Sequence, residues 1–192
     1  MPSVRSVILA AASAGVAMAE TIIVKVGQEG TTFDPQMVTA AAGDIVEFQF
    51  WPQNHSVVAG DMDKGCTPLA DDGFFSGFMP VDEGKGETAF QVEINGTAPW
   101  VFYCSQAKHC QNGMYGMING NDTALEAYMS LATDASANES PDSTDAFGGS
   151  VVTASETDSS DNSTDTEEGG AGVVAASMGM SFAAFAAAVL LS

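Results

Sequence analysis

Four residues of the sequence have side chains that could together hold a metal ion. Cys104, His109 and Met114 follow one another at even spacing within PWVFYCSQAKHCQNGMYGM, residues 99–117. The second imidazole can come from His55, the other histidine of this chain. A thiolate, two imidazoles and a weak thioether are the ligands that suit copper shuttling between its two oxidation states. The sequence therefore predicts one type 1 copper site made of these four residues.

The number of cysteines is odd. The chain has three, and in an oxidising compartment an unpaired thiol needs an explanation. Copper ligation by Cys104 supplies one and leaves Cys66 and Cys110 to form a disulfide beside His109. The alternative is that Cys104 is bridged elsewhere or is a free buried thiol, with the two histidines as ordinary surface or core residues. Met117 is the rival axial ligand, but strand parity favours a core position for it.

Apolar residues alternate with polar ones in four segments, which predicts strands with one face turned inward. The inward sets are Ile22, Val24 and Val26; Val46, Phe48 and Phe50; Phe90, Val92 and Ile94; and Trp100 and Phe102. Glu47 and Gln49 fall on the opposite face of their strand. Cys104 shares the face of Phe102, so its thiol is expected to point into the apolar interior, screened from solvent. Short strands without a strong helical segment predict an all-β fold, an antiparallel β-sandwich of about a hundred residues.

Two segments around this sandwich lack clear alternation. Residues 61–80 carry Phe74, Phe75, Phe78 and Met79 near their end. We interpret them as a long crossover packed against the sandwich near the metal end, with a partner-docking patch as the alternative. In residues 121–131 a capping residue three places before a glutamate precedes apolar spacing, which predicts a short helix closing the domain of residues 20–120.

The remaining segments predict an exported, anchored protein. Residues 1–19 end in Ala-Met-Ala and have the pattern of a cleaved signal peptide; a buried N-terminal helix is the alternative. Residues 132–172 are rich in Ser, Thr and acidic residues and are expected to be a disordered stalk. The apolar residues 173–192 have no basic flank, which favours a removed GPI signal over a retained transmembrane helix. Asn162 and Gly169 are the candidate attachment residues.

Glycosylation motifs and charge limit the partners. Asn-x-Ser/Thr motifs place candidate N-glycans on Asn95, Asn121 and Asn138, whereas the motif at Asn54 abuts a proposed ligand and is expected to stay bare. The formal net charge is −20, and residues 121–172 contain twelve acidic and no basic residues. Such a surface repels nucleic acid and anionic lipid, so nucleic acid is excluded as a partner. The expected membrane contact is the plasma membrane, through the lipid anchor.

The ordered motifs of residues 21–119 resemble the plastocyanin-like cupredoxins, in particular phytocyanins and the fungal extracellular serine-rich, GPI-anchored cupredoxin-like proteins. The matching motifs are Thr32-Phe33-x-Pro35, Ala42-Gly43-Asp44-x-Val46-x-Phe48-x-Phe50, Asn54-His55-Ser56-Val57 and Cys104-x4-His109-Cys110-x3-Met114. The resemblance implies a Greek-key β-sandwich with copper bound by His55, Cys104, His109 and Met114. It also implies the Cys66–Cys110 disulfide.

The resemblance implies a function less directly than it implies a fold. Phytocyanin-like proteins are one-electron carriers, which would give this chain a redox partner, but fungal members need not bind copper. The alternative is a cell-wall or cell-surface structural or interaction module that contacts a wall component. The sequence argues against an enzyme, because two histidines are too few for a multicopper cluster and no hydrolase, phosphate-loop or zinc-protease motif is present.

Overall fold

The computed structural model describes residues 18–156 of the chain. The expected GPI signal, its candidate attachment residues Asn162 and Gly169, and nearly all of the expected signal peptide lie outside the described residues. Within the described part, no helix is long and apolar enough to cross a bilayer.

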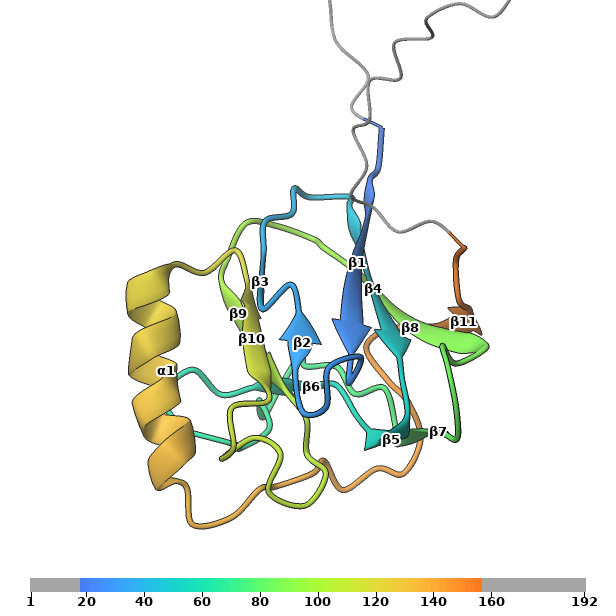
Figure 1. Ribbon diagram of the computed structural model, residues 1–192. Coiled ribbons are helices and arrows are strands. Elements are labelled where there is room, and N and C mark those ends of the chain that lie inside the picture. Colours follow the sequence, from blue (N-terminus) through green and yellow to red (C-terminus); the bar gives the residue numbers. More distant parts are fainter. Residues whose placement is uncertain (1–17, 157–192) are drawn as a thin grey trace, which may run out of the picture. The chain divides into compact units, whose positions relative to one another are not determined.

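The described chain forms eleven strands and one helix (Figure 1). They are β1 (Thr21–Val26), β2 (Phe33–Asp34), β3 (Met37–Val38), β4 (Ile45–Phe50), β5 (Gln53–His55), β6 (Val58–Gly60), β7 (Met79–Val81), β8 (Thr88–Glu93), β9 (Trp100–Tyr103), β10 (Tyr115–Ile118), α1 (Asp122–Asp134) and β11 (Ser150–Thr153). One sheet has the order β11-β8-β4-β1-β2 and the other has the order β3-β10-β9-β6, while β5 and β7 form a separate pair.

The predicted inward faces meet in one apolar core between the two larger sheets. Val24, Val26, Phe48 and Phe90 are fully buried there, and Phe102 of the second sheet packs edge-on against Phe48 with ring centroids 5.2 Å apart. Burial of this apolar surface is the main force that holds the two sheets together. The predicted β-sandwich is therefore confirmed.

The expectation of a wholly antiparallel sandwich is wrong at two places. Strand β1 pairs with β4 in parallel, and β3 pairs with β10 in parallel. Parallel neighbours need a crossover connection, and the chain between β1 and β4 supplies it by adding β2 to the first sheet and β3 to the second.

The crossover of residues 61–80 packs against the sandwich as expected. Phe74 is buried in the main core and stacks on Trp100, with ring centroids 5.6 Å apart. Phe75 is buried in a second apolar cluster beneath the helix. At the end of the segment, β7 pairs with β5 so that Met79 lies opposite His55. Packing thus fixes one side of the strand that carries a predicted ligand.

The helix predicted at residues 121–131 is present but extends to Asp134. It is capped by Asn121, whose Oδ1 accepts a hydrogen bond from the Ala124 N–H. Tyr128 and Ala132 are the helical residues buried against the domain. Because the inward face continues to Ala132, the helix gains packing for one turn beyond the predicted end.

The prediction that a disordered stalk begins at residue 132 is wrong for the described part of that segment. Residues 135–156, called the strap below, are part of the domain (orange in Figure 1). Phe147 exchanges two backbone hydrogen bonds with Phe75, each 2.9 Å long, and β11 extends the first sheet beside β8. Hydrogen bonds rather than large apolar side chains order this polar segment. Residues 157–172 lie outside the described part.

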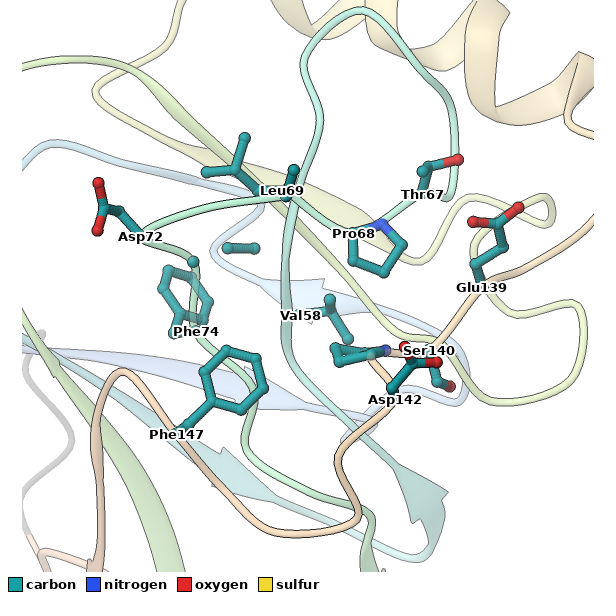
Figure 2. A pocket seen from close by; sticks show the side chains of 14 residues that line it. Val58, Thr67, Pro68, Leu69, Asp72, Phe74, Glu139, Ser140, Asp142 and Phe147 are labelled. Carbon is teal, nitrogen blue, oxygen red and sulfur yellow. The ribbon is translucent and has the colours of Figure 1, made fainter.

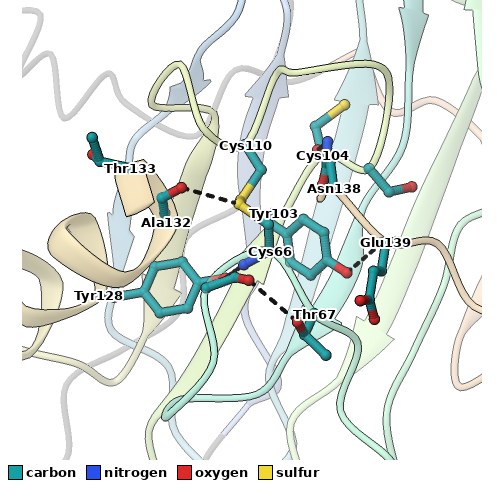
Figure 3. The surroundings of a disulfide bond; sticks show 12 residues. Cys66, Thr67, Tyr103, Cys104, Cys110, Tyr128, Ala132, Thr133, Asn138 and Glu139 are labelled. Carbon is teal, nitrogen blue, oxygen red and sulfur yellow. Dashed lines mark hydrogen bonds between the residues drawn. A yellow bond between two sulfur atoms is a disulfide. The ribbon is translucent and has the colours of Figure 1, made fainter. Parts of the chain in front are cut away.

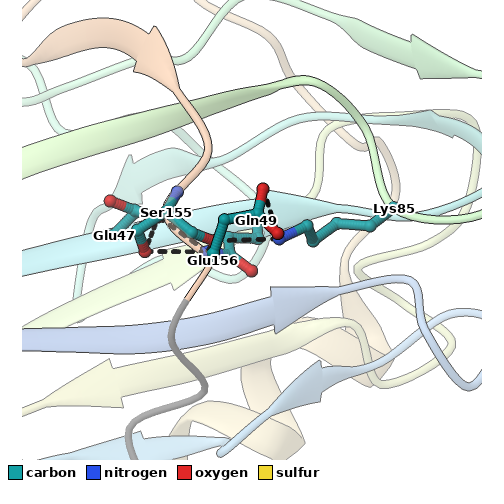
Figure 4. A network of polar contacts seen from close by, with 5 residues as sticks. All are labelled: Glu47, Gln49, Lys85, Ser155 and Glu156. Carbon is teal, nitrogen blue, oxygen red and sulfur yellow. Dashed lines mark hydrogen bonds and ion pairs between the residues drawn. The ribbon is translucent and has the colours of Figure 1, made fainter.

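The end of the strap covers the carboxylate of Glu47. Glu47, expected on the outer face of its strand, is only 1% exposed because Ser155 lies over it. Its Oε1 accepts hydrogen bonds from the Ser155 N–H and Oγ–H at 2.9 and 2.8 Å and from Gln49 Nε2 at 2.7 Å. Gln91 Nε2 donates to Oε2 at 2.7 Å. Figure 4 shows Lys85, whose Nζ donates to the Ser155 carbonyl, beside Glu47, Gln49 and Ser155. Four hydrogen bonds thus compensate the burial of this charge.

Replacing Glu47 by glutamine tests this anchor. Burial raises the pKa of Glu47, but the hydrogen bonds from Gln49, Ser155 and Gln91 outweigh it and hold the pKa below its ordinary value. Glu47→Gln is expected to lower the free energy of unfolding by about 1.5 to 3 kcal/mol at neutral pH, as for hydrogen bonds to a charged group.

The pH dependence has a defined sign. Since the folded pKa lies below the unfolded value of about 4.3, the wild-type advantage is complete above that pH and disappears as the pH falls through the folded pKa. Urea unfolding of both proteins across this range should give stabilities that converge in acid. Equal stability of the two proteins at neutral pH would contradict the role of Glu47.

Candidate metal centre

Two of the predicted ligands lie at the ends of strands, and a third lies in the loop that follows one of them. His55 is the last residue of β5, and Cys104 directly follows β9. His109 lies in the loop from β9 to β10, called the ligand loop below (residues 104–114). Both Cys104 and His55 are fully buried, whereas His109 is partly exposed.

The donor atoms of these three residues converge. The Cys104 Sγ lies 3.9 Å from His55 Nδ1 and 3.5 Å from His109 Nδ1. One ligand atom from each of the three side chains lies within 4.8 Å of the others. The structure thus brings together residues that are 49 positions apart in sequence, as the ligand pattern predicted.

Met114 lies beside the other predicted ligands. Its side chain is fully buried in the main core, its carbonyl accepts the Cys104 N–H at 3.0 Å, and its N–H donates to the His109 carbonyl at 2.9 Å. Its assignment as the axial ligand stays a prediction. Met117 is fully buried in the second apolar cluster with Cys66 and Cys110. This position agrees with the expectation that Met117 is a core residue.

Hydrogen bonds from the segment after His55 fix the sulfur. The Ser56 N–H donates to Cys104 Sγ at 3.4 Å, and the Ser56 Oγ accepts the Ser105 N–H at 2.9 Å. These two hydrogen bonds join the segment that follows His55 to Cys104 and to Ser105. Such outer contacts orient a ligand and tune a bound metal.

The imidazole of His55 packs against a glycine. A Cβ placed on Gly27 would lie 2.3 Å from His55 Nε2, and the φ angle of Gly27 is +83°, in the left-handed region. Only glycine meets both conditions without strain. The end of β1 therefore leaves the space in which the His55 ring sits.

Gly27→Ala is expected to lower the free energy of unfolding by about 2 to 4 kcal/mol, because left-handed strain and overpacking add. Gly30→Ala is the matched control, since Gly30 has a φ of +80° but nothing within 4 Å of an added Cβ. The control is expected to cost about 1 to 2 kcal/mol from strain alone. Urea unfolding measures both. Equal losses in the two variants would show that the His55 ring is not held by this contact.

The environment favours uncharged forms of the three donors. Burial lowers the pKa of both His55 and His109, and the neighbouring His109 lowers that of His55 further. Burial also raises the pKa of the Cys104 thiol above its ordinary value. A bound metal ion reverses this preference and favours the thiolate.

The predicted disulfide between Cys66 and Cys110 is present, and Cys104 is free (Figure 3). The bridge joins the crossover to the ligand loop one residue after His109. The Cys66 N–H also donates to the Tyr128 hydroxyl of α1 at 3.1 Å. Crossover, helix and ligand loop are thus fastened at one point, which constrains the backbone directly after His109.

The residues present fit a copper ion. Among the described residues, the buried side-chain N and O atoms without a hydrogen-bond partner are Asn54 Oδ1, His55 Nε2, Gln111 Oε1 and Asn138 Oδ1. One of the four belongs to a predicted ligand, and the His55 nitrogen that faces the Cys104 sulfur is the other one, Nδ1, so the fit rests on the donor set instead. A buried thiol facing two imidazole nitrogens is the donor set of a soft, redox-active metal such as copper.

The glycosylation motifs fall in different environments. Asn95 and Asn121 are exposed, and their occupancy stays a prediction. Asn138 was expected in a stalk, but the structure places it in the strap, where its amide nitrogen donates to the carbonyls of Cys104 and Gln106. A glycan on this nitrogen would remove one of its two hydrogens, so both bonds cannot persist. Asn54 donates to Gln106 Oε1 at 3.3 Å, which agrees with an unmodified side chain.

The chain was compared with protein-family models, with solved structures and with curated protein sequences. No protein-family model matches the sequence. Among solved structures, auracyanin B is 15% identical with a TM-score of 0.40, covering 55% of this chain and 91% of its own. A fern plastocyanin mutant is 23% identical with a TM-score of 0.36, covering 50% of this chain and 96% of its own.

Two curated fungal proteins, both of Arthroderma benhamiae, are more similar in sequence. An "Extracellular serine-rich protein" is 47% identical over 120 residues, which are 62% of this chain and 46% of that protein, so the chain spans about half of its length. A "Probable GPI-anchored cupredoxin-1" is 34% identical over 139 residues, which are 71% of this chain and 72% of that protein. On this similarity, together with the β-sandwich and the converging His, Cys and His side chains, the chain belongs to the cupredoxin family.

Proposed function

We propose that this protein is a secreted, surface-anchored type 1 copper protein that carries single electrons. One observation supports this most directly: the donor atoms of His55, Cys104 and His109 lie within 4.8 Å of one another at the end of a β-sandwich. With Met114 of the ligand loop as the predicted axial ligand, they would make up the two-His, Cys and Met set of blue-copper sites. The proposed role is non-enzymatic.

Copper bound by these residues would supply a one-electron couple, and the chain's own contribution is to hold the ligands still. Cys104 and His55 are buried and fixed by the Ser56 N–H and by Gly27. We therefore expect the ligands to move little when the bound copper changes its oxidation state. His109 is the member of the set that reaches solvent, so we propose that a redox partner approaches there.

The proposed location follows from the relatives and from the disulfide. The two fungal relatives are named extracellular and GPI-anchored. The disulfide between Cys66 and Cys110 is of a kind that persists in oxidising compartments. We therefore propose an extracellular protein held at the plasma membrane by a lipid anchor, with Asn162 or Gly169 as the attachment residue.

Copper loading tests the proposal. Addition of one equivalent of copper(II) to the purified protein is expected to produce an intense visible absorption from the thiolate–copper contact, bleached by ascorbate and restored by an oxidant. Zinc(II), which has no redox chemistry, is the control and is expected to leave the solution colourless. A protein that stays colourless with copper(II) would contradict the proposed function.

The alternative is a non-catalytic surface module that contacts a cell-wall component. It is favoured by the relative named only for its serine-rich, extracellular character, at 47% identity. The two functions differ in electron exchange. A blue protein that is reduced and reoxidised rapidly by small redox proteins supports the carrier, whereas tight copper binding without such exchange supports the surface module.

A further inference from the structure

The strap touches the ligand loop through two side chains, Asn138 and Ser140. Asn138 donates its amide hydrogens to the Cys104 carbonyl at 3.0 Å and to the Gln106 carbonyl at 3.4 Å. Figure 3 shows Asn138 beside Cys104. The Gln106 carbonyl also accepts the His109 N–H at 2.9 Å. Asn138 therefore fastens the backbone between the two ligands that the loop contributes.

This part of the loop has a backbone conformation that needs support. Ala107 has a φ of +46°, in the left-handed region that residues with a Cβ rarely adopt. The turn around Ala107 determines where His109 lies relative to Cys104. Such a conformation persists when surrounding contacts hold it, and the amide of Asn138 bonds the carbonyl directly before Ala107.

A second contact leads from the strap toward the sulfur. The Ser140 Oγ–H donates to Ser105 Oγ at 2.8 Å, and Ser105 Oγ lies 2.9 Å from Ser56 Oγ. Ser56 in turn donates its N–H to Cys104 Sγ. Ser56 and Ser105 are buried, so water does not compete strongly for these bonds.

The strap residue between Asn138 and Ser140, Glu139, donates its N–H to the Cys66 carbonyl at 2.9 Å and accepts the Tyr103 hydroxyl at 2.6 Å. Beyond Ser140, the strap and the crossover border a cavity of about 590 Å³, to which the crossover contributes Leu69 and the strap contributes Asp142 and Phe147 (Figure 2). The next backbone bonds of the strap are those between Phe147 and Phe75. The contacts at Asn138 and Ser140 can therefore be changed without disturbing the distant anchor at Glu47.

We propose that Asn138, supported by Ser140, is a positioning residue for the metal centre. It holds the Cys104–His109 turn so that the thiol and the imidazole keep their separation, and the strap thereby contributes to the properties of a bound metal. This inference rests on the proposed copper function. It assigns a role to a segment that follows the sandwich and its closing helix.

Substitution of Asn138 in the full-length protein tests this role. Asn138→Asp keeps the shape but removes both amide donors, and Asn138→Ala removes the side chain without adding charge. Two strap variants are controls. Ser143→Ala removes a hydroxyl whose described hydrogen bonds are all to Asp145. Ser155→Ala weakens the distant anchor at Glu47. The measurements are the visible and electron paramagnetic resonance spectra and the reduction potential of the copper-loaded proteins, and hydrogen exchange of the metal-free ones.

Both Asn138 variants are expected to shift the spectra and the potential. In the metal-free proteins they are expected to speed amide exchange in residues 104–112 about fivefold to tenfold, as for the loss of one or two hydrogen bonds. Ser143→Ala is expected to match the wild type. Ser155→Ala is expected to lower stability without moving the spectra, which separates positioning from general loosening.

The outcomes are distinct. Wild-type spectra, potential and exchange in both Asn138 variants would overturn the proposal, and so would an equal spectral shift in Ser155→Ala. A wild-type protein that takes up no copper would contradict the proposed function. Even then, exchange in the metal-free protein decides whether Asn138 holds the ligand loop.

Discussion

Cys104→Ser is expected to abolish the intense visible absorption of the copper-loaded protein completely. The absorption requires a thiolate bound to copper, and Cys104 is the free cysteine of the described chain, buried within 3.9 Å of both imidazole Nδ1 atoms. A hydroxyl is of similar size, so the fold is expected to lose only about 1 kcal/mol. Absorption spectra and urea unfolding of the two proteins measure both effects.

The two buried methionines provide a matched control for this result. Met114 lies beside the ligands, whereas Met117 packs with Cys66 and Cys110 in the second cluster. Met117→Leu is expected to keep the wild-type spectrum, and Met114→Leu to shift it as expected for loss of the axial ligand. A Cys104→Ser protein that remained intensely coloured would refute the assignment of Cys104.

Removal of the disulfide in a Cys66→Ser/Cys110→Ser double variant is expected to cost about 3 to 4 kcal/mol of unfolding free energy, from the entropy of a loop of about 45 residues. The double variant leaves Cys104 as the sole cysteine, so no thiol can exchange into a wrong pairing. The His109 side of the ligand loop should also lose order in the metal-free protein, because the bridge lies one residue away.

Urea unfolding and hydrogen exchange of the double variant measure these two effects. Cys104→Ser, which keeps the bridge, is the appropriate reference for the stability measurement. A loss below about 1 kcal/mol would mean that the bridge constrains the unfolded chain far less than loop entropy predicts.

The long strands could be predicted from the sequence because one face of each is buried. Val46, Phe48 and Phe50 alternate with Glu47 and Gln49, and the apolar set does lie in the core. The pattern could not show that the opposite face is also covered, since the covering residue is Ser155, over a hundred positions away. Strands of two or three residues, such as β2 and β3, are too short to show any alternation.

The strap escaped prediction for a related reason. A composition of Ser, Asp, Thr and Gly predicts a chain that cannot bury enough apolar surface to fold. Here order comes from bonds to particular partners: Asn138 to Cys104, Phe147 to Phe75 and Ser155 to Glu47. None of these partners is near the strap in sequence, so only the folded structure reveals them.

The metal-binding residues could be predicted from the sequence more readily than the residues that hold them in place. Cysteine and histidine are scarce in this chain, so their positions limit the possible sites to very few combinations. The residues that orient them have ordinary side chains or none. Gly27 acts by leaving space, Ser56 by its backbone N–H, and Asn138 through two carbonyls. A glycosylation motif at Asn138 even pointed toward a different role.

The pairing of β11 with β8 has a consequence for solubility. Without residues 150–153, β8 would become an edge strand whose unpaired N–H and C=O groups could template pairing with a second molecule. The strap moves the sheet's border to a strand of four residues, too short to recruit a neighbour firmly. A chain cut before Ser150 is therefore expected to self-associate. In the intact protein, the end of the strap protects the β-sandwich from aggregation.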